Sequence, residues 1–270
     1  MTTRHSSAWL DLLESSCARV SITCLDIIVD QAGSKSPLLP SILSVEPPLP
    51  WFSLFSGLPE AGAEELAPLL LRVDLTQPLQ RHWLLGLMHD LDASSQLLIL
   101  ASRWPFQDLA HYLGRCLEAR NGGYLGLLRY YDPRVFPLLF SHVLHPEQQQ
   151  QLLRPAVFWS WLDRDGMFQR LSGGADGFED PDDFMPIELS DSQLDTLGCA
   201  SDATLALQNL GDALAGEWRA ERRFQAWYAA MLEATQAGLL LAPEREAFAL
   251  EWVRTIGEDQ PRTNRNEHHG

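Results

Sequence analysis

The chain has 270 residues and is 46% hydrophobic, with 9 Trp and 11 Phe, which excludes a disordered chain and allows a sizeable core in one large domain or two lobes. Its formal net charge of -16 argues against a nucleic-acid partner, because the phosphates would be repelled. No stretch approaches the roughly 20 uninterrupted apolar residues of a membrane helix, and the N-terminal segment has no cleavable signal pattern.

The cysteines show no paired metal-ligand spacing. They are Cys17, Cys24, Cys116 and Cys199. Unpaired thiols of this kind are typical of a reducing compartment. Together with the missing signal pattern, they predict a cytoplasmic protein without a membrane partner.

Apolar segments alternate with amphipathic ones in the first half of the chain. The apolar segments of strand length are residues 20–29, 69–73 and 96–101. The segments with helical spacing are residues 7–16, 60–67, 79–89 and a helix opened by Pro105, whereas residues 33–50 are rich in Pro and Ser and read as an irregular loop. This alternation predicts a partly parallel sheet covered by helices.

The most strongly patterned segment runs from Gly122 to Leu171. A Gly-Gly turn precedes residues 124–131, an apolar run of strand length. Asp132 and Pro133 then predict a helix start, because the Asp carboxylate can accept a bond from an orphan N–H and Pro fits the first helical position. The further predicted elements are a helix to about Leu144, a helix over residues 148–153, and a hairpin of strands 156–162 and 167–171 around a turn at 163–166.

The composition changes after this segment. Residues 173–195 contain eight acidic residues and no Lys or Arg, and their Gly and Pro content predicts a loop. Two longer helices follow, one from Asp202 to Leu214 and on towards Ala234, and one over residues 243–256. The predicted fold class is mixed α/β, with an N-terminal lobe of mixed sheet and helices and a C-terminal all-helical lobe. Its predicted parts are an α/β lobe (1–171), an acidic linker (172–189), a helical lobe (190–256) and a disordered tail (257–270).

Several catalytic and cofactor motifs can be checked in the sequence, and most of them are incomplete. Lys35 is the only lysine, and residues 33–36 lack the glycines of a phosphate-binding loop. Pro181-Asp182-Asp183 lacks the lysine of a metal nuclease motif, and no Gly-x-Ser-x-Gly elbow is present. No catalytic residue, cofactor or metal ligand is therefore expected.

His142 and His145 leave one enzymatic alternative open. Their spacing could place two imidazoles on one helix face, but no His-Glu-x-x-His pattern accompanies them. A role at the helix C-terminus is the competing interpretation. The alternative function is a small metal-dependent hydrolase that uses these two histidines and the acidic loop.

One part of the sequence consists of the run Arg129-Tyr130-Tyr131-Asp132-Pro133-Arg134, followed by Trp159-Ser160-Trp161 and an Asp-Gly turn. This part resembles the effector adaptor family of bacterial type VI secretion systems. Weaker pieces are similar as well: Leu25-Asp26, residues 51–57 and Ala67-Pro68-Leu69-Leu70. The resemblance implies a non-enzymatic cytoplasmic chaperone that loads a toxic effector onto the secretion spike. The implied partners are that effector and a VgrG-type spike protein.

Within this run, Asp132 and Pro133 are expected to be architectural, since Asp132 can cap a helix and pair with a neighbouring Arg. Arg129 and Arg134 could form a catalytic cluster with Asp132, but an architectural role is the preferred interpretation and partner contact is the second. Because the resemblance implies that such residues shape the effector-binding lobe, the partner contacts are expected at Arg129, Tyr131 and Arg134.

Trp159 and Trp161 share one face of their strand. If that face is open, they are aromatic anchors of an interface; the alternative is that both faces of the strand are core. Arg164, in the following turn, is expected at the interface rim. A groove between the tryptophan strand and the aromatic C-terminal helices would then hold the client at equilibrium.

Overall fold

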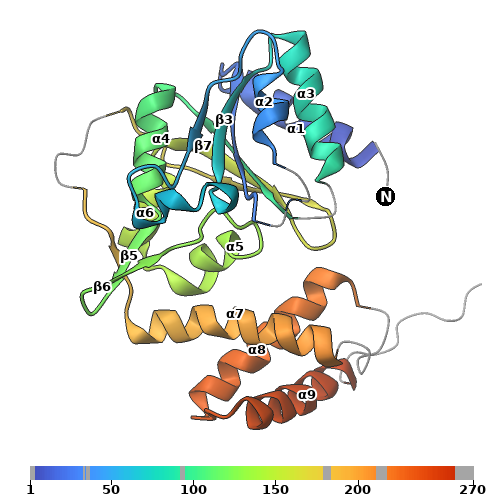
Figure 1. Cartoon of the computed structure of the whole chain (residues 1–270). Helices are drawn as coiled ribbons and strands as arrows, with labels where there is room; N and C mark the ends of the chain where they lie inside the picture. The colour runs from blue at the N-terminus through green and yellow to red at the C-terminus, as the bar shows by residue number, and fades with distance from the viewer. Residues whose placement is uncertain are drawn as a thin grey trace, which may run out of the picture. The chain divides into compact units, whose positions relative to one another are not determined.

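The computed structural model describes residues 4–32, 34, 37–91, 95–178, 184–210 and 218–258. The chain divides into two units, Met1–Ser190 and Asp191–Gly270 (Figure 1). The first unit combines two sheets with helices, and the described part of the second is helical. The predicted mixed α/β class is therefore confirmed.

A six-stranded sheet forms the centre of the first unit. Its strands are β1 (Cys24–Val29), β2 (Trp51–Ser53), β3 (Leu69–Asp74), β4 (Leu97–Ser102), β7 (Ala156–Leu162) and β8 (Phe168–Ser172). Their order is β2-β3-β1-β4-β7-β8, and every neighbouring pair is antiparallel. The prediction of a partly parallel sheet is wrong here, because β1 lies between β3 and β4. Helix α3 (Pro78–Asp90) joins those two strands, which run in the same direction but do not pair.

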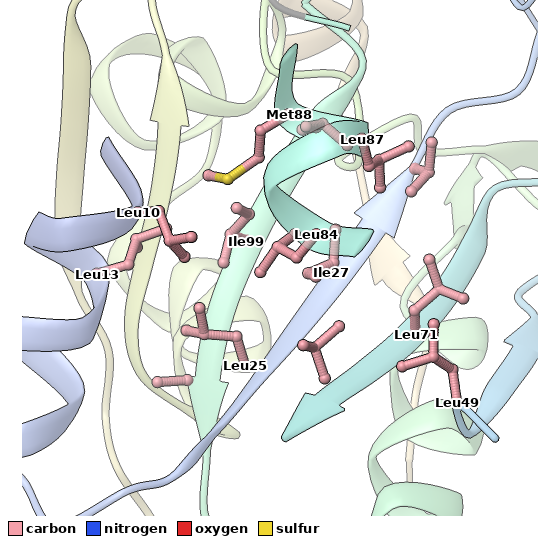
Figure 2. Close-up of a cluster of buried hydrophobic side chains, with 14 of the residues drawn as sticks. Leu10, Leu13, Leu25, Ile27, Leu49, Leu71, Leu84, Leu87, Met88 and Ile99 are labelled. Carbon is pink, nitrogen blue, oxygen red and sulfur yellow. The ribbon is translucent and has the colours of Figure 1, made fainter. Parts of the chain in front are cut away.

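One face of this sheet packs against α1 (Arg4–Arg19) and α3 (Figure 2). Alternate strand residues point to this face and meet apolar helix residues. The buried cluster includes Leu10, Leu13, Leu25, Ile27, Leu71, Leu84, Leu87, Met88 and Ile99. Burial of each such side chain stabilises the fold by about 1.5–3 kcal/mol. The indole of Trp9 also donates a hydrogen bond to Ser160 Oγ at 3.0 Å, which ties α1 to β7.

The segment expected to be irregular contains a short helix, α2 (Leu39–Leu43). Pro40 stands in its first turn, where the missing N–H costs nothing, and Ile42 is buried in the same core cluster. The helix predicted over residues 60–67 is instead two single 3₁₀ turns, Pro59–Gly62 and Glu64–Leu66.

A smaller sheet has the order β6-β5-β9. Its strands are β5 (Glu118–Asn121), β6 (Tyr124–Leu127) and β9 (Ile187–Glu188). β5 and β6 are antiparallel around Gly122-Gly123, whose φ angles of 53° and 89° suit a two-residue hairpin turn. β9 pairs with β5 in parallel. The strand predicted over 124–131 thus ends at Leu127.

Helix α4 (Phe106–Arg115) lies on the side of the large sheet opposite α1 and α3 (Figure 1). Three further segments complete the first unit: α5 (Phe136–Leu138), a π-helical turn (Leu139–Val143) and α6 (Pro146–Leu153).

The second unit contains α7 (Asp191–Leu210), α8 (Ala220–Gln236) and α9 (Ala242–Glu258). The helix predicted to continue from Asp202 to Ala234 is interrupted, because the backbone of Arg219 is extended (ψ 159°). Gly238, with φ 74°, follows the end of α8 as expected. Arg245 of α9 bonds to Asp202 of α7 (2.9 Å) and to Thr235 of α8 (2.8 Å), so one guanidinium joins all three helices. Within the described ranges of both units, no helix is long and apolar enough to span a bilayer.

Candidate functional site

Residues Arg129 to Arg134, between β6 and α5, form a tight turn that we call the arginine corner. The N–H of Asp132 donates to the carbonyl of Arg129 at 3.2 Å, and the N–H of Phe136 donates to the carbonyl of Asp132 at 2.8 Å. The α-helix begins only at Phe136. The predicted helix start at Pro133 is therefore wrong in position, because the chain first completes this turn, in which Pro133 is buried.

The side chain of Asp132 holds the corner together and is only 6% exposed. Its Oδ1 accepts the N–H of Arg134 at 2.9 Å, which closes an Asx turn. The guanidinium of Arg134 binds the same carboxylate in bidentate fashion, with Nε–Oδ1 at 2.9 Å and Nη2–Oδ2 at 2.8 Å. These hydrogen bonds raise the pKa of Arg134. The structure thus places Asp132 in a turn and an ion pair rather than in a helix cap.

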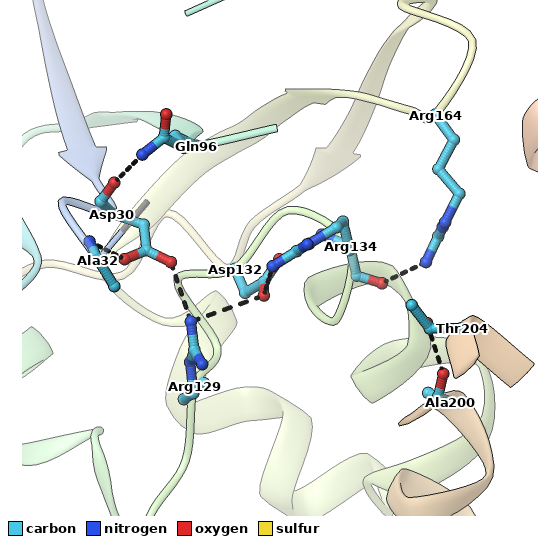
Figure 3. A network of polar contacts seen from close by, with 9 residues as sticks. All are labelled: Asp30, Ala32, Gln96, Arg129, Asp132, Arg134, Arg164, Ala200 and Thr204. Carbon is cyan, nitrogen blue, oxygen red and sulfur yellow. Dashed lines mark hydrogen bonds and ion pairs between the residues drawn. The ribbon is translucent and has the colours of Figure 1, made fainter. Parts of the chain in front are cut away.

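Arg129 links the corner to the large sheet (Figure 3). Its Nη2 donates to Asp30 Oδ2 at 3.0 Å and lies 3.9 Å from Asp132 Oδ2. Asp30 directly follows β1, and it is fixed by the N–H of Ala32 (3.0 Å) and by the side chain of Gln96, which donates to its carbonyl at 2.6 Å. Two half-exposed guanidiniums therefore rest on two buried carboxylates.

Tyr130 and Tyr131, within the same turn, are both buried. The hydroxyl of Tyr130 donates to the carbonyl of Leu113 at 2.9 Å, and the guanidinium carbon of Arg129 lies 5.5 Å from the ring centre of Tyr131. Burial raises the pKa of both phenols, so both stay protonated at neutral pH. Since Tyr131 presents almost no surface, it can act on a partner only by positioning Arg129.

Trp159 and Trp161 are both buried, at 0% and 8% exposure. The ring of Phe136 packs on both, with centroid distances of 5.1 and 5.3 Å. The indole of Trp159 donates to the carbonyl of Leu152 at 3.1 Å. The sequence left open whether these tryptophans are exposed interface anchors or part of the core. In the structure they are part of the core.

Arg164 connects the β7–β8 turn to the arginine corner by a hydrogen bond. Its Nη2 donates to the carbonyl of Arg134 at 3.3 Å. The turn is shaped by Asp163, whose Oδ1 accepts the N–H of Asp165 at 2.9 Å, and by Gly166, with φ 73°. The three arginines predicted for partner binding, Arg129, Arg134 and Arg164, therefore occupy one region of the first unit (Figure 3).

In the part of the chain that the structure describes, His142 and His145 belong to no metal site. Nδ1 of His142 lies 2.6 Å from Ser141 Oγ, and burial lowers the pKa of this imidazole. His145 caps α6, where its N–H donates to Gln148 Oε1 at 2.8 Å. Among the described residues, no three His, Cys, Asp or Glu side chains could hold a metal ion. The acidic-loop and phosphate-loop candidates lie outside the described residues: Asp180, Asp182, Asp183 and Lys35.

Sequence reasoning missed a buried ion pair in the large sheet. Asp26 and Arg72 stand opposite each other in β1 and β3, with Nε–Oδ1 at 2.7 Å and Nη2–Oδ2 at 2.9 Å. The third nitrogen of Arg72, Nη1, donates to the carbonyl of Trp104 at 3.0 Å. Burial raises the pKa of Asp26 to about 6. The sequence signal for this pair was a single carboxylate, Asp26, within one apolar strand and a single arginine, Arg72, within the next predicted strand.

Residues 27–151 match a family model described as "Domain of unknown function (DUF4123)". The matched segment covers a little under half of the chain and contains the whole arginine corner together with Asp30 and Gln96. Neither a curated protein nor a solved structure matches the chain.

Proposed function

We propose that this chain is a non-enzymatic, cytoplasmic adaptor that binds a type VI secretion effector and promotes its loading onto a VgrG-type spike protein. The observation that carries the proposal is the domain match over residues 27–151, since this domain is associated with type VI secretion adaptors. The match contains the arginine run and two of the weaker pieces of the resemblance, residues 51–57 and 67–70, whereas Leu25-Asp26 and Trp159-Ser160-Trp161 with its Asp-Gly turn lie outside it.

The arginine corner is the client contact in this proposal. The side chains of Arg129 and Arg134 are 46% and 51% exposed, whereas their carboxylate partners Asp30 and Asp132 are 8% and 6% exposed. The corner therefore shows its cationic groups to a partner and hides its anionic groups. Such a surface suits carboxylates or backbone carbonyls of the client.

The geometry of the corner favours binding because the guanidiniums are already held in place. A guanidinium has five N–H donors, and Arg134 uses two of them on Asp132. Those two bonds fix the planar group before the client arrives, so less side-chain entropy is lost when a further bond forms. Asp132 and Tyr131 act in this account as positioning residues for the two arginines.

Titration calorimetry with the purified effector tests the proposal. The effector is first identified as the protein that co-elutes with the tagged chain from its own host. Replacement of both corner arginines, Arg129→Ala with Arg134→Ala, should weaken effector binding at least about tenfold. Arg103→Ala is the matched control, because Arg103 is an exposed arginine outside the corner that bonds to the carbonyl of Val20. Equal binding by the double variant and the control would remove the corner from the interface.

A further inference from the structure

The outer edge of β6 has backbone groups that point away from its sheet. β6 is the terminal strand in the order β6-β5-β9, so its partner among the described strands is β5 alone. The N–H of Leu128 donates to the carbonyl of Leu117 at 2.7 Å, which continues the β5–β6 ladder by one pair. Because these bonds alternate along an antiparallel strand, the N–H and C=O groups of Leu125 and Leu127 face outwards.

The short strand β6 lacks three features by which proteins often protect an edge strand. Charged side chains, prolines and bulges are typical protections, and the sequence of β6 is Tyr-Leu-Gly-Leu. The edge formed by β8 differs, since β8 carries Arg170 at its centre. Tyr124 and Leu125 are 81% and 58% exposed. Among the described strands, this edge is therefore open in its backbone, and the side chains of Tyr124 and Leu125 are exposed.

The charges around β6 select the kind of segment that can pair with it. In the register of this sheet, Leu125 stands beside Arg120 of β5, which in turn stands beside Glu188 of β9. Glu118 stands on the same face, so this face carries two carboxylates and one guanidinium. The whole chain also has a net charge of -16, which opposes pairing with a second copy.

We propose that β6 binds an extended segment of a partner polypeptide by strand addition, and that this segment has apolar residues at alternate positions and basic residues at its ends. Main-chain hydrogen bonds to Leu125 and Leu127 provide the affinity for the segment. The side chains of Tyr124 and Leu125 contact its apolar residues. The inference rests on the proposed function only in taking this segment to belong to the effector.

The test uses the full chain and a fluorescein-labelled peptide, Arg-Val-Thr-Val-Thr-Val-Arg, in an anisotropy titration. Leu125→Pro removes an outward N–H, whereas Leu125→Ala keeps it and is the matched control. We expect Leu125→Pro to weaken peptide binding at least about tenfold and Leu125→Ala to have a smaller effect. Replacement of both peptide arginines by Glu should also weaken binding.

Hydrogen exchange on the wild-type chain keeps the test decisive if Leu125→Pro fails to fold. Bound peptide should slow exchange at the amides of Leu125 and Leu127 and leave those of Tyr124 and Gly126 unchanged, because the latter already face β5. No saturable peptide binding, equal binding by both variants, or protection confined to another strand would overturn the inference. A β6-dependent dimer in sedimentation would overturn it in favour of a second copy. The assay contains no effector, so its failure is distinct from failure of the proposed function.

Discussion

The carboxylate of Asp132 binds Arg134 three times: it accepts the backbone N–H at 2.9 Å and two guanidinium N–H groups at 2.9 and 2.8 Å. A buried carboxylate thus sets both the path of the turn and the direction of an exposed cation. Asp132→Ala removes all three bonds. We expect the free energy of unfolding to fall by about 1–3 kcal/mol, measured by urea denaturation.

Asp132→Asn serves as its control, since an amide oxygen can still accept the backbone N–H of Arg134. It should lose less stability than Asp132→Ala. If Asp132→Ala unfolds at the wild-type urea concentration and yet loses effector binding, Asp132 is a contact residue and not a positioning residue.

Trp161 is expected to act on stability rather than directly on binding. Its ring is buried against Phe136, so Trp161→Ala should lower the free energy of unfolding by about 3–5 kcal/mol. Trp51→Ala is the comparison, because Trp51 lies on the edge strand β2 and is 36% exposed. Its replacement should lower the free energy of unfolding by less. Thermal unfolding followed by circular dichroism measures both. A Trp161→Ala variant of wild-type stability would show that the strand is not core.

Gly173 is required by a close backbone approach. A Cβ at this position would lie 1.9 Å from the carbonyl oxygen of Ala156 and 2.6 Å from its carbon, and neither backbone atom can move away easily. We expect Gly173→Ala to distort the end of β8 and to lower the melting temperature or the soluble yield sharply. At Gly177 a Cβ would meet no atom within 4 Å, so Gly177→Ala should be close to neutral. Similar melting temperatures for the two variants would contradict this account.

Mild acidification should stabilise the chain. The pKa of Asp26 is raised from 3.8 to about 6 in the folded state, mainly because burial disfavours its charged form. Between these two values the folded state binds more protons than the unfolded state, so stability falls as pH rises through this window, by at most about 1.4 kcal/mol per pH unit. Lower pH also reduces the self-repulsion of a chain with a net charge of -16.

Urea denaturation at pH 7 and at pH 5 measures the effect. The free energy of unfolding should be higher at pH 5. Asp26→Asn lacks the titrating group and should show a smaller difference between the two pH values. A lower stability at pH 5 than at pH 7 would contradict this account of Asp26.

The sequence was sufficient to predict local elements but not their arrangement. The strands at β1, β3 and β4 and the β7–β8 hairpin were predictable because apolar length and turn residues define them locally. The insertion of β1 between β3 and β4 was not, because pairing partners are set by long-range packing. The same reason explains the tryptophans: the sequence places Trp159 and Trp161 on one face, but Phe136, which covers that face, comes from a different segment.

The candidate site was predictable in part. The run from Arg129 to Arg134 could be selected from its residue types and from the resemblance, whereas its second carboxylate, Asp30, is nearly one hundred residues earlier in the chain. The turn at Asp132 was missed because the Asp-Pro pair favours a helix start and a turn start equally well. Only the hydrogen bonds of the folded chain separate these two outcomes.

A secretion assay in the native host tests the central claim most directly. The gene for this chain is deleted in frame, and the effector and the VgrG-type spike protein are quantified in cells and in the medium. The account predicts that the effector disappears from the medium while the spike protein is still secreted, that wild-type chain restores effector secretion, and that the Arg129→Ala, Arg134→Ala double variant does not. Unchanged secretion of the effector by the deletion strain would contradict the account.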